Sequence, residues 1–191
     1  MERIDASAQG GWAPKSERNV LPRPLNNVSV YLITFSTYGS HLPGQEGTTD
    51  RNHNIPGPRR CESQPKLRRS VETFMRQSLF EMSAPERTIV LDALLGISRH
   101  KQWQLLAAHV RSNHVHSVVE ADATPEAVMQ LFKSYASRAL NLDNPCTQGR
   151  IRWARRGSAR RLASTESVEA AIRYVLAKQG ELMAWYSLPA R

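Results

Sequence analysis

Cysteine is scarce in this chain, with only Cys61 and Cys146 among its 191 residues. Two cysteines supply neither a disulfide framework nor the paired Cys-x-x-Cys ligands of a structural zinc site. The sequence also has no run of about 18 apolar residues, which a membrane helix would need, and its N-terminus lacks the apolar core of a signal peptide. These absences predict a protein of the reducing cytoplasm that does not enter the membrane.

Several catalytic motifs are absent as well. The chain lacks the Gly-x-x-x-x-Gly-Lys loop that cradles nucleotide phosphates, so no nucleotide cofactor is expected. It also lacks the Gly-x-Ser-x-Gly turn of serine hydrolases and the His-x-Glu and Pro-Cys-x-x-Cys motifs of zinc deaminases. Nucleotide-driven chemistry, acyl transfer by an activated serine and deamination therefore have no support in the sequence.

Acidic residues are outnumbered: 17 Asp and Glu stand against 26 Lys and Arg, for a formal net charge of +9. A charge this large on a chain this small predicts a polyanionic partner, with nucleic acid as the first choice. The alternative is a basic surface that serves only solubility. Arginine predominates in the clusters at 59–60, 68–69 and 150–161, and its planar guanidinium suits bidentate contacts with phosphate oxygens.

Hydrophobic periodicity predicts an ordered series of strands and helices. β-Branched and aromatic residues at 28–37 predict a central strand. Helices are predicted over 67–80, 84–100, 125–140 and 165–180, and two further strands over 104–110 and 114–120. The basic segment 150–163, centred on Gly157, is interpreted as a hairpin, with a single strand as the alternative. This order fits an α+β fold, a ferredoxin-like antiparallel sheet with helices on one face in a single domain.

The polar, proline-interrupted segment 1–27 is predicted to be a flexible tail before a domain at 28–186, and 187–191 a short C-terminal tail. Within the domain, 38–66 is predicted to be a long loop rich in Gly and Pro. Asp50 and His53 in this loop could ligate a metal or contact DNA. We favour a simpler interpretation, a binding loop without catalytic residues.

His114 and His116 open the strand at 114–120 after a polar turn. Alternate strand residues point to the same face, so the two imidazoles are expected to lie side by side. Such a pair fills a core poorly but suits a divalent metal, because neutral imidazole is a common metal ligand. On this motif alone, a surface pair at the mouth of a hairpin is the alternative.

Hydroxyl groups remain as nucleophiles, and two tyrosines lie on predicted helices. Tyr135 falls on the apolar stripe of the helix at 125–140, which indicates a core residue. Tyr174 falls at the edge of the stripe of the helix at 165–180, where a phenol can reach solvent or a ligand. Tyr174 is therefore a candidate nucleophile, although periodicity alone favours an ordinary boundary tyrosine.

The segment 107–116, AAHVRSNHVH, resembles the motif of single-tyrosine HUH transposases, in which two histidines flank a bulky apolar residue. The similarity extends over roughly residues 28–186. It includes ITFSTYG (33–39), GTTDRNHN (47–54), WARRGS (153–158) and AIRYVLAKQGE (171–181). Together these segments resemble the REP-associated tyrosine transposases and their insertion-sequence relatives.

The resemblance implies DNA transposition by metal-dependent cleavage of single-stranded DNA. His114 and His116 would bind Mg²⁺ or Mn²⁺ with Gln179 as third ligand, and Tyr174 would attack the scissile phosphate. The products would be a 5′-phosphotyrosine and a free 3′-hydroxyl, and a second 3′-hydroxyl could reverse the step to transfer the strand. Hairpin or palindromic DNA is the implied partner. An active site built from one chain or from a homodimer is equally compatible with the resemblance.

The basic segment and the last helix are expected to supply the DNA contacts, through Arg150, Arg152, Trp153, Arg155, Arg156 and Lys178.

Gln179 departs from the family pattern, in which insertion-sequence relatives tend to place this glutamine four residues after the tyrosine. Here Lys178 occupies that place, and Gln179 lies about 140° from Tyr174 around an ideal helix. Either the last helical turn is distorted, or the metal is held less completely.

The alternative to a transposase is a non-catalytic, domesticated nucleic-acid-binding protein of the same fold.

Overall fold

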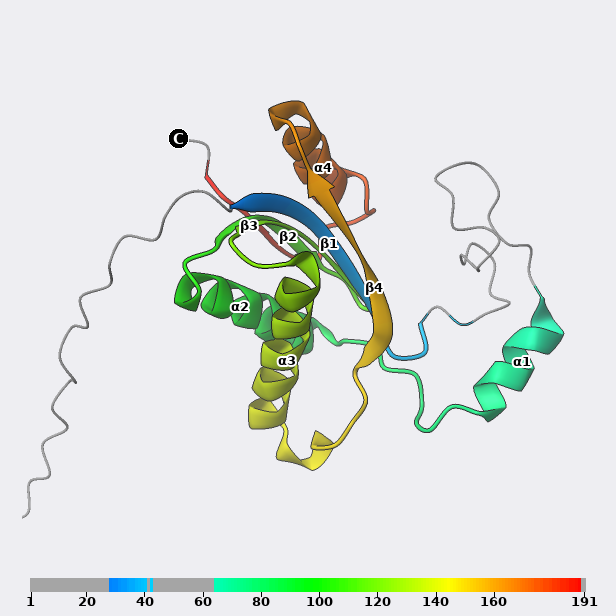
Figure 1. Ribbon diagram of the computed structural model, residues 1–191. Helices are drawn as coiled ribbons and strands as arrows, with labels where there is room; N and C mark the ends of the chain where they lie inside the picture. Colours follow the sequence, from blue (N-terminus) through cyan, green and yellow to red (C-terminus); the bar gives the residue numbers. More distant parts are fainter. Residues whose placement is uncertain (1–27, 41, 43–63, 190–191) are drawn as a thin grey trace, which may run out of the picture.

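Strand β1 (Ser29–Thr37) runs through the sheet between β3 (His114–Ala121) and β4 (Trp153–Leu162), and it is antiparallel to both. The computed structural model describes residues 28–40, 42 and 64–189. Beyond β3 lie β2 (Gln104–Val110) and the short edge strand β5 (Ala184–Ser187), so the order is β4-β1-β3-β2-β5 with antiparallel neighbours throughout (Figure 1).

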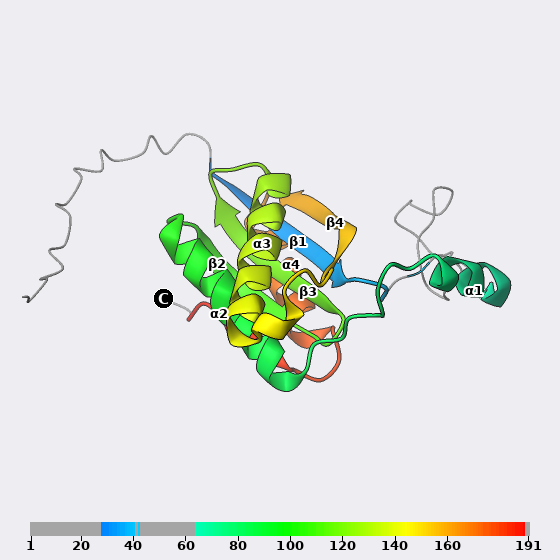
Figure 2. The same ribbon diagram turned by 90° about the horizontal axis from the view of Figure 1, so that it is seen from below.

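Helices cover both faces of this sheet. Helices α2 (Ala84–His100) and α3 (Pro125–Asp143) pack on one face, and α4 (Thr165–Ala177) packs on the other (Figures 1 and 2). Helix α1 (Pro65–Thr73) buries no side chain and lies apart from the sheet in both views, and a 3₁₀ turn, η1 (Pro145–Thr147), follows α3. Ser83, Thr124 and Ser164 cap the N-termini of α2, α3 and α4 by accepting a backbone hydrogen bond.

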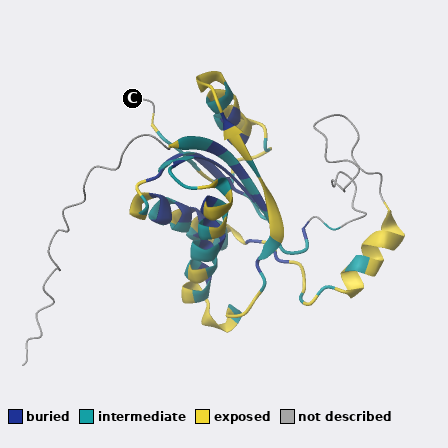
Figure 3. Ribbon diagram, in the orientation of Figure 1, coloured by how far each residue is buried: buried dark blue, intermediate teal, exposed yellow. Residues whose placement is uncertain are grey.

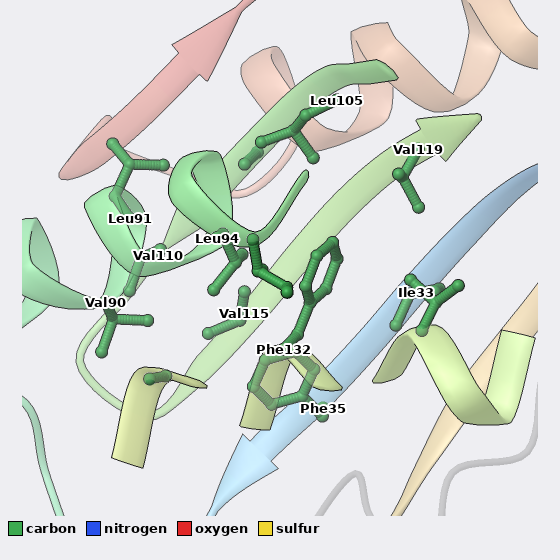
Figure 4. Close-up of a cluster of buried hydrophobic side chains, with 14 of the residues drawn as sticks. Ile33, Phe35, Val90, Leu91, Leu94, Leu105, Val110, Val115, Val119 and Phe132 are labelled. Atoms are coloured by element: carbon green, nitrogen blue, oxygen red, sulfur yellow. The ribbon is translucent and has the colours of Figure 1, made fainter. Parts of the chain in front are cut away.

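The two faces of the sheet carry two apolar clusters. The larger lies under α2 and α3 and includes Ile33, Phe35, Leu94 and Phe132, all close to fully buried (Figure 4). The smaller lies under α4, where Ala171 and Val175 pack on Ala107, Val118 and Leu162 of the sheet. Figure 3 shows the buried residues concentrated along the sheet and the helix faces that meet it.

The predicted α+β class and ferredoxin-like antiparallel sheet are confirmed. The expectation that all helices share one face holds for α2 and α3 and is wrong for α4. The physical reason is the second apolar patch on the sheet: alternate residues such as Val118 and Leu162 point away from the main core and need a cover of their own. The placement of α4 matters for function, because this helix carries Tyr174.

Of the two interpretations of 150–163, the hairpin is wrong and the strand is confirmed, since 153–162 form the single strand β4. Gly157 is required for close packing rather than for a turn. A Cβ atom there would lie 2.6 Å from the Thr34 carbonyl oxygen on β1 and 2.6 Å from Met129 Sδ on α3.

Two further differences concern short segments. The helix predicted at 67–80 ends at Thr73, and the chain then runs without regular structure until Phe80 and Met82 enter the core. The backbone N–H groups of these two residues donate to Tyr38 and Ser112 carbonyls, contacts that no local pattern encodes. The sequence does not predict strand β5, because four residues are too few to show a hydrophobic period.

The predicted tail at 1–27 and most of the predicted loop at 38–66, with Asp50 and His53, lie outside the described residues. Among the residues that the structure does describe, no helix is long and apolar enough to cross a membrane.

Candidate active site

The turn between β2 and β3 is held in place by the neighbouring segments. The Asn113 carbonyl accepts from the Thr37 backbone N–H at 2.8 Å, and the Thr37 and Ser40 hydroxyls donate to the same oxygen. The Ser112 carbonyl accepts from the Met82 N–H at 2.7 Å. A turn anchored from two sides gives the histidines that follow it a fixed starting point.

His114 and His116 project from the α4 face of the sheet with ring centroids 4.7 Å apart. Each imidazole is held in place by a contact at its Nδ1 atom. Asn113 Oδ1 can only accept, so the 2.6 Å contact means that His114 Nδ1–H donates, which leaves Nε2 as the nitrogen that could bind a metal ion. His116 Nδ1 lies 2.7 Å from Thr34 Oγ1 on β1. Metal-binding histidines characteristically make a hydrogen bond of this kind with the ring nitrogen that does not bind the metal.

Burial keeps His116 neutral. Desolvation, reinforced by the charge of His114, lowers the pKa of His116 from its usual 6.5 to about 3, while a hydrogen bond with the Gln179 side chain acts in the opposite direction. A neutral imidazole presents a lone pair to a metal ion, whereas an imidazolium cannot. His116 is therefore in its ligating form at neutral pH.

Tyr174 on α4 faces this pair. Its ring centroid lies 5.5 Å from that of His116 with the planes nearly perpendicular, and 40% of the residue is exposed. Tyr135, the competing tyrosine, packs against the large cluster from α3 on the opposite face of the sheet. The sheet thus separates Tyr135 from the histidines and brings Tyr174 to them.

Gln179 reaches the site because α4 ends before it. The helix stops at Ala177, and Lys178 is its cap, with φ −114° and ψ 15°. Gly180, at φ +77°, then turns the chain in the left-handed region that glycine favours. The 140° offset of an ideal helix does not apply to a residue beyond the helix end, and the Gln179 side chain contacts His116. The sequence raised two possibilities, a distorted last helical turn or a less complete metal site. The structure shows that the last turn of α4 is distorted.

These side chains fit a divalent cation as a set of two imidazoles and one amide. Among the described residues, no group of three or more His, Cys, Asp or Glu comes together to hold a metal. A site at this position would therefore depend on His114, His116 and Gln179, with the remaining positions open to water or substrate oxygen. Nitrogen and amide-oxygen donors with open positions are compatible with Mn²⁺ or Mg²⁺.

The strand register adds two residues that the sequence did not single out. Thr34, His116, His109 and Trp185 stand opposite one another across β1, β3, β2 and β5. His109 is fully buried, with its Nδ1 3.2 Å from the Val175 carbonyl of α4, and its Nε2 accepts from the Met183 N–H at 3.1 Å. His109 thereby ties the sheet to the helix turn next to Tyr174. Trp185 is 49% exposed at the end of the same row.

The expected DNA contacts divide into two groups. Arg155, Arg156 and Lys178 are exposed, and Arg150 lies on the surface with its guanidinium 5.0 Å above the Phe80 ring. Arg152 is buried and donates to the Thr147 hydroxyl at 2.6 Å, and burial lowers its pKa.

Trp153 is partly buried, and its Nε1–H donates to α3. Arg152 and Trp153 thus make structural contacts within the domain, and their contact with DNA stays a prediction.

Fold and site together define an α+β protein that presents an exposed tyrosine to a pair of histidines. The family model described as "Transposase IS200 like" matches residues 70–178, more than half of the chain. The chain belongs to the IS200-like transposase family.

Two solved structures are similar in fold. One is a REP-associated tyrosine transposase bound to a REP hairpin, with 10% sequence identity and a TM-score of 0.48, covering 78% of this chain and 66% of that one. This chain thus spans slightly less than two thirds of that protein. The other is a Deinococcus radiodurans protein assigned as a transposase, with 14% identity and a TM-score of 0.41, covering 87% and 98%. No curated protein matches the chain.

Proposed function

We propose that this protein cleaves single-stranded DNA beside a hairpin and rejoins it to another end, with Tyr174 as the nucleophile. The observation that carries the proposal is the 5.5 Å separation of the Tyr174 and His116 rings, with Tyr174 exposed. A tyrosine that served packing alone would be expected to bury its ring. Here the ring stands at the rim of a polar site on a basic protein.

The reaction balances without an outside energy source. Tyr174 Oη attacks the phosphorus in line, the P–Oη bond forms, and the bond from phosphorus to the 3′ oxygen breaks. The phenol proton ends on the departing 3′ oxygen by way of solvent, so the products are a 5′-phosphotyrosine and a 3′-hydroxyl. A 3′-hydroxyl from another strand can reverse the step, because the covalent ester conserves the bond energy.

The histidine pair and Gln179 are the residues that would hold Mg²⁺ or Mn²⁺, which when bound supplies positive charge to the scissile phosphate. Thr34 and Asn113 orient the two imidazoles through their Nδ1 atoms. His109 holds α4 against the sheet, so that the Tyr174 ring stays beside that of His116.

The DNA strand is proposed to cross the α4 face along the row of residues that contains the histidines. Arg156 stands two residues before Ser158, which is opposite Thr34 at the β4 end of this row, and Trp185 lies at the β5 end. Arginine can contact the phosphates, and an exposed indole can stack on a base. Lys178 adds a cation at the end of α4.

The test is a covalent adduct. The protein is incubated with Mn²⁺ and oligonucleotides that carry a hairpin with single-stranded flanks, and the products are separated under denaturing conditions. We expect an adduct with the wild type and with Tyr135→Phe, and none with Tyr174→Phe. An adduct that survives Tyr174→Phe and disappears with Tyr135→Phe would refute the assignment.

The non-catalytic alternative gives a different result. A nucleic-acid-binding protein without chemistry would bind the oligonucleotide, form no adduct, and bind Mn²⁺ no more weakly after His114→Ala. Calorimetric titration of Mn²⁺ into the wild type and His114→Ala separates the two functions.

A further inference from the structure

Arg111 lies beside the histidine pair and has had no role so far. It precedes the β2–β3 turn, and its backbone N–H donates to the His114 carbonyl at 2.9 Å, so the two residues face each other across the hairpin. Its side chain extends to the segment after α4. A Cβ atom placed on Gly180 would lie 3.2 Å from Arg111 Nη1 and 3.5 Å from Nη2. The guanidinium therefore sits between the hairpin and the residue next to Gln179.

One nitrogen of this guanidinium has no hydrogen-bond partner among the described residues. Nη1 is buried and, within the described part of the chain, makes no hydrogen bond. Neither of the ion pairs found among the described residues involves Arg111. A buried N–H donor without an acceptor is costly, and the cost is greater on a charged group. Such a donor at the edge of a reactive site indicates a place for an acceptor that arrives with a ligand.

The charge of the guanidinium indicates the charge of that ligand. The site combines this guanidinium with the imidazoles of His114 and His116, and none of the three groups carries negative charge. An anion would offset this charge, and a phosphate oxygen matches the planar donors of arginine.

We propose that Arg111 binds a non-bridging oxygen of the phosphate that Tyr174 attacks. The inference rests on the proposed function for the identity of the phosphate. It adds a substrate-binding residue from the hairpin, opposite the histidine that begins β3. Lysine would keep the charge but lose the paired donors, so Arg111→Lys is expected to retain only part of the interaction.

Binding and chemistry can be tested separately in the full-length chain with Tyr174→Phe, which holds the DNA without cleaving it. Affinities are measured for a set of hairpin oligonucleotides, each with one neutral methylphosphonate in place of a phosphate in the single-stranded flank. The set is repeated with Arg111→Met and Arg111→Lys. Arg99→Met is the matched control, because it removes the same charge from the exposed end of α2 on the opposite face.

We expect one position in the flank at which neutralising the phosphate weakens binding about tenfold when Arg111 is present and much less after Arg111→Met. Arg99→Met should show no such position. An equal loss at every position, or no loss, would overturn the assignment of Arg111. If Arg111→Met does not fold, as judged by circular dichroism, the same dependence on position in Arg111→Lys decides the question. A wild type that forms no adduct refutes the proposed chemistry, whereas the phosphate contact is judged by binding alone.

Discussion

Replacing Trp153 by phenylalanine tests whether this ring belongs to the core or to the DNA surface. The indole Nε1–H donates to the Lys133 carbonyl at 3.0 Å and to Ser137 Oγ at 2.9 Å, and both acceptors belong to α3. The ring also meets Phe35 edge-on with centroids 5.1 Å apart. Trp153→Phe keeps an aromatic ring but removes the donor and shortens the side chain.

The expected cost follows from these contacts. Loss of the hydrogen bond from Nε1 costs about 1 kcal/mol. The smaller ring fills less of the space beside Phe35, and its weakened aromatic contact costs about 1 kcal/mol more. The free energy of unfolding should therefore fall by about 2 kcal/mol, which for a chain of this size lowers Tm by roughly 4–8 °C.

Urea unfolding followed by far-UV circular dichroism measures this loss, and fluorescence anisotropy measures DNA affinity. The matched substitution Trp185→Phe, at a half-exposed ring, should change stability by less than about 0.5 kcal/mol. Trp185→Ala should weaken single-stranded DNA binding about tenfold. If Trp153→Phe weakened DNA binding and left stability unchanged, the structural role of Trp153 would be refuted.

Three other perturbations have definite outcomes. Thr34→Val removes the oxygen beside His116 Nδ1 with little change of shape, and calorimetry should show Mn²⁺ affinity reduced by about tenfold or more. Gly180→Ala forces a Cβ into a left-handed conformation next to Arg111, and thermal unfolding should show a loss of about 1 kcal/mol. Burial lowers the pKa of His109, so the unfolded chain binds more protons just below pH 6.5. Stability of the metal-free protein should therefore fall as the pH drops below about 6.5, and chemical denaturation should show a smaller fall for His109→Asn.

Much of the fold could be predicted from local pattern. The predicted limits of strand β1 and helix α2 agree with the observed ones within a residue. Residues 28–37 are rich in β-branched and aromatic side chains, and 84–100 have one long apolar face. The shared face of His114 and His116 followed from the two-residue period of a strand. The resemblance to a transposase family, carried by the histidine and tyrosine segments, is confirmed by the family match over 70–178.

Other features depend on contacts between distant residues. The segment 150–163 has many arginines and a central glycine whichever structure it forms. Only its pairing with β1 makes it one strand. The need for glycine at 157 becomes clear only from the close approach of the Thr34 carbonyl and Met129. Trp153 and Arg152 look like surface residues in a basic run, and their burial follows from the packing of α3 and η1 against the start of β4.

The sequence by itself determined the chemical groups of the site: two imidazoles on one strand face, a tyrosine at a helix edge, and a strongly basic chain. The tertiary structure decided which of them meet. It put α4 on the face opposite α2 and α3, so that Tyr174 and not Tyr135 faces the histidines. It also ended α4 before Gln179 and brought Arg111 to the same place. Spacing along a chain fixes which face a side chain occupies, but only the packing of helices on a sheet fixes which faces come together.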